Sequence, residues 1–255
     1  MTTVIEKEPQ TLPGIRYSRL SDRAVVTLDR PQQRNAINDT MVTSLHTVCD
    51  DLERHPAPLI ITGGPDIFAA GADISQLRDR RHPDALAGIN SGLFERIARL
   101  PLPTVAAVAG PAIGGGAELA YACDFRIATT TAKFGNPETQ LGILAAAGAC
   151  WRLQELVGEP LAKEILLLSK ILDAEAAHAA HLVTEVVELD KLLDTAHATV
   201  DRLLKSATTA LRLTKLALRM PREAHPIFDN VAQAVLFETP EKFERMDAFL
   251  QRNHR

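Results

Sequence analysis

Hydrophobic and polar positions in the first two-thirds of the chain alternate between the periods of strands and of helices. Short apolar runs over residues 15–20 and 24–28 predict two strands joined by a brief polar turn. Residues 38–54 instead place apolar side chains every three to four positions. That spacing predicts an amphipathic helix, capped at its start by Asn38 or Asp39.

The same alternation continues into a cluster of glycines. Residues 59–61 predict a short buried strand, and helically spaced apolar positions between 86 and 100 predict another helix. An apolar strand over 104–109 runs into a glycine loop, and a helix follows as far as Cys123. Residues 125–129 predict a further strand. Such β-α-β alternation implies crossover connections and a mostly buried sheet, so the predicted fold class is α/β.

After about residue 150 the pattern becomes largely helical. The remaining predicted elements are a short strand at 183–188 and helices at 190–204, 206–219, 225–237 and 240–251. The composition changes there from glycine-containing loops to helices rich in Ala, Leu, Arg and Lys. We therefore expect three parts: a flexible tail at 1–14, a core domain at 15–195, and a helical region at 196–255 that packs on the core or on another subunit.

Composition narrows the class of protein. The chain has 255 residues, is 46% hydrophobic and carries a formal charge of −4. Nothing in this charge attracts nucleic acid or an anionic membrane surface, and no apolar run reaches the roughly 18 residues of a membrane span. The first 14 residues lack the features of a signal or transit peptide. A soluble protein that binds neither nucleic acid nor membrane is expected.

The cysteines and histidines indicate neither a disulfide framework nor a metal site. Cys49, Cys123 and Cys150 are odd in number and far apart, which is typical of reduced thiols in a cytoplasmic protein. His178 and His181 have metal-like spacing, but no cluster of further ligands is evident, so no metal is expected. Because no histidine lies in or next to the glycine segments, nucleophilic catalysis has little support.

Three segments of small residues could carry chemistry. The first, residues 68–74, is a loop of mostly small residues, so a ligand could come close to its backbone N–H groups. The alternative is an ordinary tight loop in which Asp73 caps the following helix. The second, residues 109–119, reads as strand, glycine loop and helix start, with Glu118 in the first turn. A dinucleotide-binding loop has a similar outline, but the glycine spacing does not fit it.

The third segment, residues 134–138, holds Glu138 at a turn that Pro137 fixes. Taken alone, Glu138 would most often be a solvated loop carboxylate. None of the three segments identifies a function by itself.

Together and in this order, the segments resemble the crotonase, or enoyl-CoA hydratase/isomerase, family. The resemblance runs from about residue 24 to the C-terminus. It is carried by residues 28–31 with 34–38, 69–74, 114–119, 134–138 and 246–252. It implies a crotonase-like ββα spiral core with a C-terminal helical region, which in that family forms trimers, often paired as hexamers.

The resemblance also implies an activity, the addition of water across the 2,3-double bond of a 2-enoyl-CoA. By motif position, the N–H groups of Ala72 and Gly115 would form an oxyanion hole for the thioester oxygen. Glu118 would take a proton from water, and Glu138 would supply one to C2. Relatives that only shift double bonds commonly lack one of these glutamates.

Coenzyme A would enter as part of the substrate, and no separate cofactor is implied. Arg34 is placed to reach a phosphate, and Phe249 and Arg252 would reach the coenzyme A of a neighbouring subunit. The other residues that the resemblance assigns to substrate binding are Ala36, Ala70, Asp73, Ile74 and Gly114.

One departure from the family bears on the pocket. The family usually has a Pro-Gly turn about seven residues after the second glutamate, where this chain has Ala145 and Ala146. Alanine still presents backbone N–H groups, so the following helix can survive, but the start of that helix and the shape of the pocket stay open. The alternatives to a hydratase are a Δ3-Δ2 enoyl-CoA isomerase that uses Glu138 alone, a non-catalytic acyl-CoA binding protein and, with least support, a dinucleotide oxidoreductase.

Overall fold

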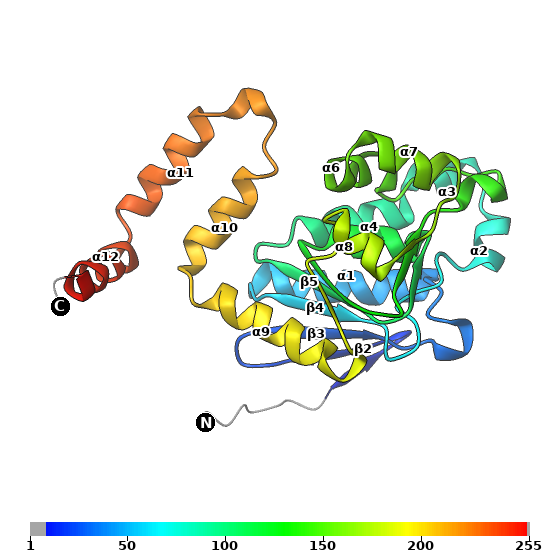
Figure 1. Cartoon of the computed structure of the whole chain (residues 1–255), viewed down its shortest axis with the longest axis horizontal. Coiled ribbons are helices and arrows are strands. Elements are labelled where there is room, and N and C mark those ends of the chain that lie inside the picture. The colour runs from blue at the N-terminus through cyan, green and yellow to red at the C-terminus, as the bar shows by residue number, and fades with distance from the viewer. Residues whose placement is uncertain (1–8, 254–255) are drawn as a thin grey trace.

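Two β-sheets organise the protein, whose computed structural model describes residues 9–253 (Figure 1). Across the larger sheet the strands follow the order β1 (Gln10–Leu12), β2 (Ile15–Arg19), β3 (Ala24–Leu28), β4 (Leu59–Thr62), β5 (Thr104–Val108), β7 (Phe125–Thr129) and β10 (Glu185–Val187). The smaller sheet has the order β6 (Pro111–Ile113), β8 (Lys133–Gly135) and β9 (Leu172–Asp173). Apart from β1, both sheets lie in the part of the chain that the sequence assigned to an α/β core.

The larger sheet begins antiparallel and becomes parallel. Strands β1, β2 and β3 pair antiparallel, whereas β3, β4, β5, β7 and β10 pair parallel to their neighbours. Every residue of β4 and β5 is buried, as expected for central strands covered on both faces. Along β5, Ala106 and Val108 pack into one hydrophobic cluster, and Val105 and Ala107 into another. This alternation is the two-residue period of a strand.

Helices cover both faces of this sheet. Helices α1 (Asp39–Arg54), α4 (Ile89–Ala98) and α5 (Gly115–Ala122) contribute buried side chains to the cluster on one face. Helix α9 (Leu192–Leu204) packs on the other face (Figure 1). The predicted cap of α1 is Asn38, whose Oδ1 accepts a hydrogen bond of 3.0 Å from Met41 N. The strands and helices predicted between residues 15 and 129 are all present.

Two parts of the predicted organisation differ from the structure. Residues 10–12 lie in the predicted tail, but they form edge strand β1 of the larger sheet. The predicted boundary after residue 195 falls inside α9, which continues to Leu204 and buries Ala196 and Val200 against the sheet. Helix α9 therefore belongs with the core. Residues 1–8 of the predicted tail and residues 254 and 255 of the helical region lie outside the described residues.

The remaining helices surround the core or follow it. They are α2 (Ile74–Asp79), α3 (His82–Ala87), α6 (Gln154–Val157), α7 (Glu159–Leu167), α8 (Ala174–Ala179), α10 (Thr208–Ala217), α11 (Ile227–Phe237) and α12 (Pro240–Asn253). Short helical turns occur at Pro31–Gln33, Glu138–Leu141, Ala149–Leu153, Leu189–Lys191 and Arg222–Ala224. Helices α10, α11 and α12 form an arm that extends away from the sheets, and the chain ends at its far end (Figure 1). No helix within residues 9–253 is both long enough and apolar enough to cross a bilayer.

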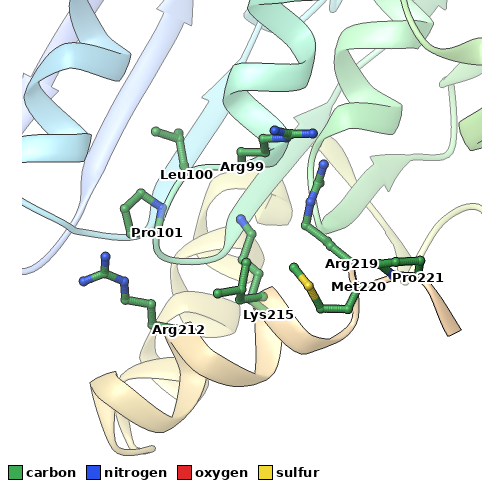
Figure 2. A pocket seen from close by; sticks show the side chains of 9 residues that line it. Arg99, Leu100, Pro101, Arg212, Lys215, Arg219, Met220 and Pro221 are labelled. Atoms are coloured by element: carbon green, nitrogen blue, oxygen red, sulfur yellow. The ribbon is translucent and has the colours of Figure 1, made fainter. Parts of the chain in front are cut away.

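The arm is attached at a basic groove beside the end of α4. Lys215 Nζ of α10 donates to Asp124 Oδ2 at 2.7 Å and to the carbonyl of Leu102 at 3.0 Å. Arg219 donates to Glu95 Oε1 at 2.7 Å. Figure 2 shows Lys215 and Arg219 reaching toward the segment that contains Arg99, Leu100 and Pro101. These residues line a cavity of about 510 Å³. This cavity lies apart from the glycine segments.

Candidate active site

The three small-residue segments meet at one cavity of about 170 Å³. Seven of the residues assigned to the site by sequence line this cavity: Ala70, Ala72, Ile74, Gly114, Gly115, Glu118 and Glu138. Two isolated bridges, Ile37 with Ala72 and Ala69 with Ala112, hold the first segment between the loop before α1 and strand β6. The strand ends therefore bring segments far apart in sequence to one place.

The backbone N–H groups of Ala72 and Gly115 lie close together, and neither donates a hydrogen bond within the backbone pairing around them. Ile37 N donates to Gly71 O at 2.8 Å and Asp73 N to Ile37 O at 2.9 Å, so the intervening Ala72 N points away from this pairing. Gly115 begins α5, where the first N–H groups have no partner within the helix. Neither Ala72 N nor Gly115 N donates to any residue in the described part of the chain. A Cβ placed on Gly115 would lie 3.3 Å from Ala72 N, so the two donors are close enough to share one acceptor.

Gly114 allows this arrangement because of its backbone conformation. Its φ of 55° and ψ of −128° suit glycine rather than residues with a side chain. A Cβ at this position would also lie 3.1 Å from Glu138 Oε1. The glycine therefore sets the entry into α5 and lets the Glu138 carboxyl approach the backbone.

Glu118 lies in the first turn of α5 and is 4% exposed. Its Oε1 accepts hydrogen bonds from Ala147 N at 2.8 Å and from Ala149 N at 3.1 Å. Burial raises the pKa of this carboxyl to about 7, while the bonds from Ala149 and Ala147 partly oppose that rise by favouring the ionised form. Glu118 is therefore held as a group that can gain or lose a proton near neutral pH.

Glu138 begins the helical turn at Glu138–Leu141, directly after Pro137. Its Oε1 accepts from Asn136 Nδ2 at 3.3 Å, and the same amide lies 3.4 Å from Gly114 O. Its Oε2 is buried and has no hydrogen-bond partner among residues 9–253. Burial raises the pKa of Glu138, which favours its protonated form.

The helix that follows the family's Pro-Gly position is retained despite Ala145 and Ala146. A helical turn runs from Ala149 to Leu153, and Gly148 precedes it with a φ of 139°. The two N–H donors that hold Glu118 come from the residues on either side of Gly148. The loop therefore still donates two backbone hydrogen bonds to the Glu118 carboxylate, with Ala145 and Ala146 just before it.

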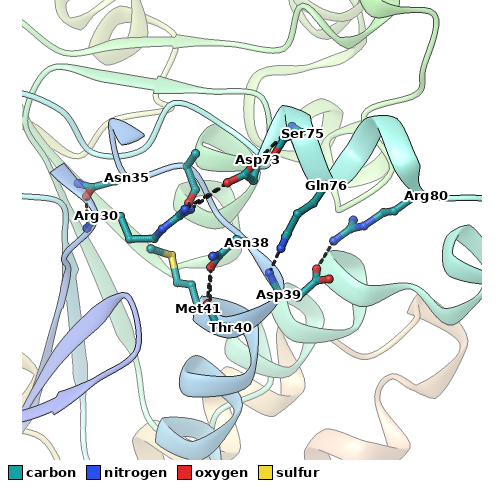
Figure 3. Close-up of polar contacts among 11 residues, drawn as sticks. Arg30, Asn35, Asn38, Asp39, Thr40, Met41, Asp73, Ser75, Gln76 and Arg80 are labelled. Atoms are coloured by element: carbon teal, nitrogen blue, oxygen red, sulfur yellow. Dashed lines mark hydrogen bonds and ion pairs between the residues drawn. The ribbon is translucent and has the colours of Figure 1, made fainter. Parts of the chain in front are cut away.

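Asp73 and Arg34 occupy structural positions near the cavity. Asp73 caps α2 by accepting from Ser75 N at 3.2 Å, and its other oxygen accepts from Arg30 at 3.2 Å (Figure 3). The Ser75 hydroxyl and then Arg30 hold the pKa of Asp73 below its usual range. The side chain of Arg34 is exposed, and its carbonyl accepts from Ala70 N at 3.0 Å. Ala36, also assigned to the substrate, accepts a hydrogen bond from Arg30 through its carbonyl.

Phe249 and Arg252 lie on α12 in the arm and do not line the cavity of their own chain (Figure 1). The sequence assigned them to the site of a neighbouring subunit, and that assignment stays a prediction.

Three polar residues near the cavity were missed by sequence reasoning. Arg80 and Asn90 line it, and Arg152, from the turn behind Glu118, bonds Glu95 Oε2 at 2.8 Å. Asn90 had a detectable signal, because it lies on the same face of the predicted helix as Leu93, Phe94 and Ile97, which are all buried. A polar residue on a buried face is unusual enough to mark a site.

Comparison with known proteins gives one consistent result. The family model described as enoyl-CoA hydratase/isomerase matches residues 21–253. A probable enoyl-CoA hydratase of Mycobacterium bovis is 35% identical over 239 residues, which cover 89% of this chain and 91% of that protein. A short-chain-enoyl-CoA hydratase of Clostridium acetobutylicum is 34% identical over 238 residues, covering 90% and 91%.

Solved structures agree with the sequence relatives. The crystal structure of an enoyl-CoA hydratase from Bacillus anthracis superposes with a TM-score of 0.88 at 27% identity, covering 94% of this chain and 96% of that one. The predicted α/β class, with a crotonase-like spiral core and C-terminal helices, is therefore confirmed.

Proposed function

The chain belongs to the enoyl-CoA hydratase/isomerase family, and from this premise we propose that it is an enoyl-CoA hydratase. It would add water across the 2,3-double bond of a 2-enoyl-CoA to give a 3-hydroxyacyl-CoA. The observation that carries the proposal is the single cavity lined by Glu118, Glu138, Ala72 and Gly115.

The two unused N–H groups suit the charge that hydration develops. When water adds to C3, electrons move from the double bond to the thioester oxygen, which becomes an enolate. Ala72 N and Gly115 N would donate to that oxygen, with Gly115 at the positive end of α5. Each such donor contributes about 10²–10³ in rate, because it is in place before the charge forms.

The two glutamates suit the proton transfers. Ionised Glu118 takes a proton from the water as its oxygen bonds to C3, and protonated Glu138 gives a proton to C2. Burial raises the pKa of both carboxyls, and for Glu118, at about 7, two hydrogen bonds from backbone N–H groups help to retain an ionised fraction that can act as the base. The assignment of the base to Glu118 and of the acid to Glu138 follows the family resemblance and is part of the proposal. Exchange with solvent then restores both groups, and the overall reaction consumes only the enoyl thioester and water.

The presence of two carboxyl groups on one cavity favours hydration over isomerisation. A Δ3-Δ2 isomerase only moves a proton between C2 and C4, and one carboxyl group is enough for that. In this chain Glu118 is held by backbone bonds beside Glu138 rather than being replaced by an apolar residue. A water held between two carboxyls has no role in isomerisation.

Substrate binding completes the proposal. Arg34, Ala36, Ala70, Asp73, Ile74 and Gly114 would bind the coenzyme A part of the substrate, and Phe249 and Arg252 would reach it from a neighbouring subunit. The proposed assembly is a homotrimer or a pair of trimers.

The test is turnover of crotonyl-CoA, followed by loss of the absorbance of the conjugated thioester and by mass of the product. We expect hydration by the native chain, and a fall in kcat of about 10²–10⁴ in both Glu118→Gln and Glu138→Gln, because each variant removes one proton-transfer group. An isomerase would leave crotonyl-CoA unchanged and would convert a 3-enoyl-CoA even as Glu118→Gln. Tight binding of acyl-CoA without turnover of any chain length would instead identify a non-catalytic binding protein.

A further inference from the structure

A side-chain amide lies beside the two backbone donors that the proposed function assigns to the thioester oxygen. Asn90 is in the first turn of α4 and lines the reaction cavity together with Ala72 and Gly115. A Cβ placed on Gly115 would lie 3.3 Å from Ala72 N and 3.8 Å from Asn90 Nδ2, and it would share its Cα with Gly115 N. Three N–H donors from three separate segments therefore surround one point.

The direction of this amide is fixed from its other side. Arg80 Nη1 donates to Asn90 Oδ1 at 3.3 Å. Because a guanidinium can only donate, the amide atom that faces Arg80 is the oxygen, and Nδ2 faces Gly115. Arg80 is itself held by Asp39, whose Oδ1 accepts from Nη2 at 2.6 Å (Figure 3). Asp39 balances the charge of Arg80, so this pair presents the cavity with an oriented amide rather than with a free positive charge.

The amide donor has no partner in the described part of the chain. Asn90 is only 9% exposed, and no acceptor for its Nδ2 occurs among residues 9–253. The other buried side chains on this face of α4 include Leu93, Phe94 and Ile97, so packing alone would suit an apolar residue here. A buried amide with an unused donor on a cavity wall is available to a group that enters the cavity.

A donor at this place becomes more valuable as the reaction proceeds. When water adds to C3, the thioester oxygen becomes an enolate oxygen, which accepts hydrogen bonds more strongly than the carbonyl does. The Arg80 guanidinium draws electron density toward Asn90 Oδ1, and this makes the Nδ2 hydrogens better donors. An apolar side chain of the same size would supply neither effect.

We propose that Asn90 is a third donor of the oxyanion hole, whose Nδ2 donates to the thioester oxygen beside Ala72 N and Gly115 N as charge develops on that oxygen. Arg80 is the positioning residue that holds the amide in this direction. The inference rests on the proposed hydratase function and adds a side chain to its machinery.

The first test measures kcat and KM for crotonyl-CoA in Asn90→Leu and Asn90→Ala. Leucine nearly keeps the size of the side chain and alanine leaves extra room, so a loss common to both does not come from blocked space. We expect kcat to fall by roughly ten-fold or more in both, with KM changing by less than about three-fold, because the lost bond forms mainly to the charged oxygen. A smaller fall in kcat in either folded variant, or a loss confined to KM, overturns the inference.

The second test measures binding of the charged oxygen without turnover. Acetoacetyl-CoA ionises to an enolate that absorbs in the ultraviolet, so ionisation of the bound ligand can be followed against pH. We expect the midpoint to lie about one unit higher on Asn90→Leu than on the native protein, which is a ten-fold change in the ionisation equilibrium. Equal midpoints overturn the inference. If the native protein leaves crotonyl-CoA unhydrated, the hydratase function is rejected while the enolate measurement still decides the donor, so the two failures are distinguishable.

Arg80→Met tests the positioning role. Without the guanidinium the amide is free to turn, so kcat should fall, though by less than in Asn90→Leu. The double variant should be no slower than Asn90→Leu alone, because Arg80 acts through the amide. Arg78→Met is the matched control, since Arg78 is exposed two residues away, does not line the reaction cavity and should keep the native kcat. Losses that multiply in the double variant, or an equal loss in the control, overturn the positioning role.

Discussion

Glu118 is subject to two opposing effects on its pKa. Removal from water penalises the charged carboxylate, and the nearby Glu138 adds to that penalty, while two backbone N–H groups and Arg152 favour the charge. The balance raises the pKa from an ordinary 4.5 to about 7. A general base is most useful when its pKa lies near the working pH, because it is then both available and strong enough to take a proton.

This balance predicts the pH dependence of activity. We expect kcat/KM for crotonyl-CoA to rise with pH through about 7, because the ionised form of Glu118 takes the proton from water. The two glutamates interact, so the apparent midpoint belongs to the pair. A pH–rate profile between 5 and 9 measures it. A flat profile across this range would count against Glu118 as the base.

The same shift predicts how stability changes with pH. A carboxyl whose pKa is raised on folding stabilises the native state below the unfolded pKa, and this contribution is lost as pH rises from about 4.5 to about 7. Glu118→Gln removes the titration but can accept the same two hydrogen bonds. We therefore expect the variant and the native chain to melt together near pH 5, and the variant to melt several degrees higher at pH 8. Scanning calorimetry at the two pH values decides this.

At the residue scale, sequence could locate the charged groups but not their environment. Glu118 and Glu138 stand in recognisable motifs, and the structure places both on one cavity. The donors from Ala147 and Ala149 are backbone atoms, and their direction depends on how the chain passes behind α5. No residue type marks such a contact, so the sequence could not predict it.

Among the elements, one carboxylate of helix α4 connects the turn at Ala149–Leu153 to the segment that follows helix α10. Glu95 of α4 bonds Arg152 at 2.8 Å, Arg99 at 2.6 Å and Arg219 at 2.7 Å. Arg152 is mostly buried and lies close enough to Glu118 to lower its pKa, whereas Arg99 is largely exposed. Arg152 is therefore a positioning residue that acts on the site through charge.

This arrangement predicts a shift in the pH profile without loss of the reaction. Arg152→Met removes a positive charge near Glu118, so the midpoint of kcat/KM should move upward by roughly half a unit to one unit. Glu95 keeps Arg99 and Arg219 as partners in this variant and is not left unpaired. Arg99→Met removes a charge from the same carboxylate on its exposed side and should leave the midpoint in place. Equal shifts in both variants would assign the effect to general surface charge.

Local periodicity predicted most elements because each one buries a regular set of side chains. Helix α1 and strands β2 and β3 show this directly. Strands β4 and β5 are buried at every residue, and their continuous apolar runs predicted them instead. Strand β1 has only three residues and lies at the sheet edge, so its sequence contains no repeat to detect. The predicted boundary in α9 failed because composition changes near residue 195, whereas the helical spacing of Leu192, Ala196 and Val200 continues across it. Spacing was the better guide to packing.

At the scale of the whole molecule, the arm has an apolar face that nothing in the described chain covers. Ile227, Val231 and Val235 recur every four residues of α11 and are 72%, 61% and 54% exposed. A stripe of this kind on an extended arm is costly in water and is typical of a subunit interface. Exposed apolar side chains on α12, including Phe249, continue it toward the end of the chain.

The stripe predicts that the chain associates, and the proposed trimer or pair of trimers predicts a mass in solution of three or six times that of one chain, measured by light scattering after gel filtration. Val231→Asp places a charge in the stripe and should shift the mass toward that of one chain, because an interface cannot bury that charge without a partner. Gln233→Asp adds the same charge at another exposed position of α11 and should leave the mass of the assembly unchanged.

If Phe249 and Arg252 complete the coenzyme A site of a neighbour, KM for crotonyl-CoA should rise as Val231→Asp is diluted below its assembly range. Unchanged KM in a single-chain form would mean that each subunit binds its substrate without its neighbours.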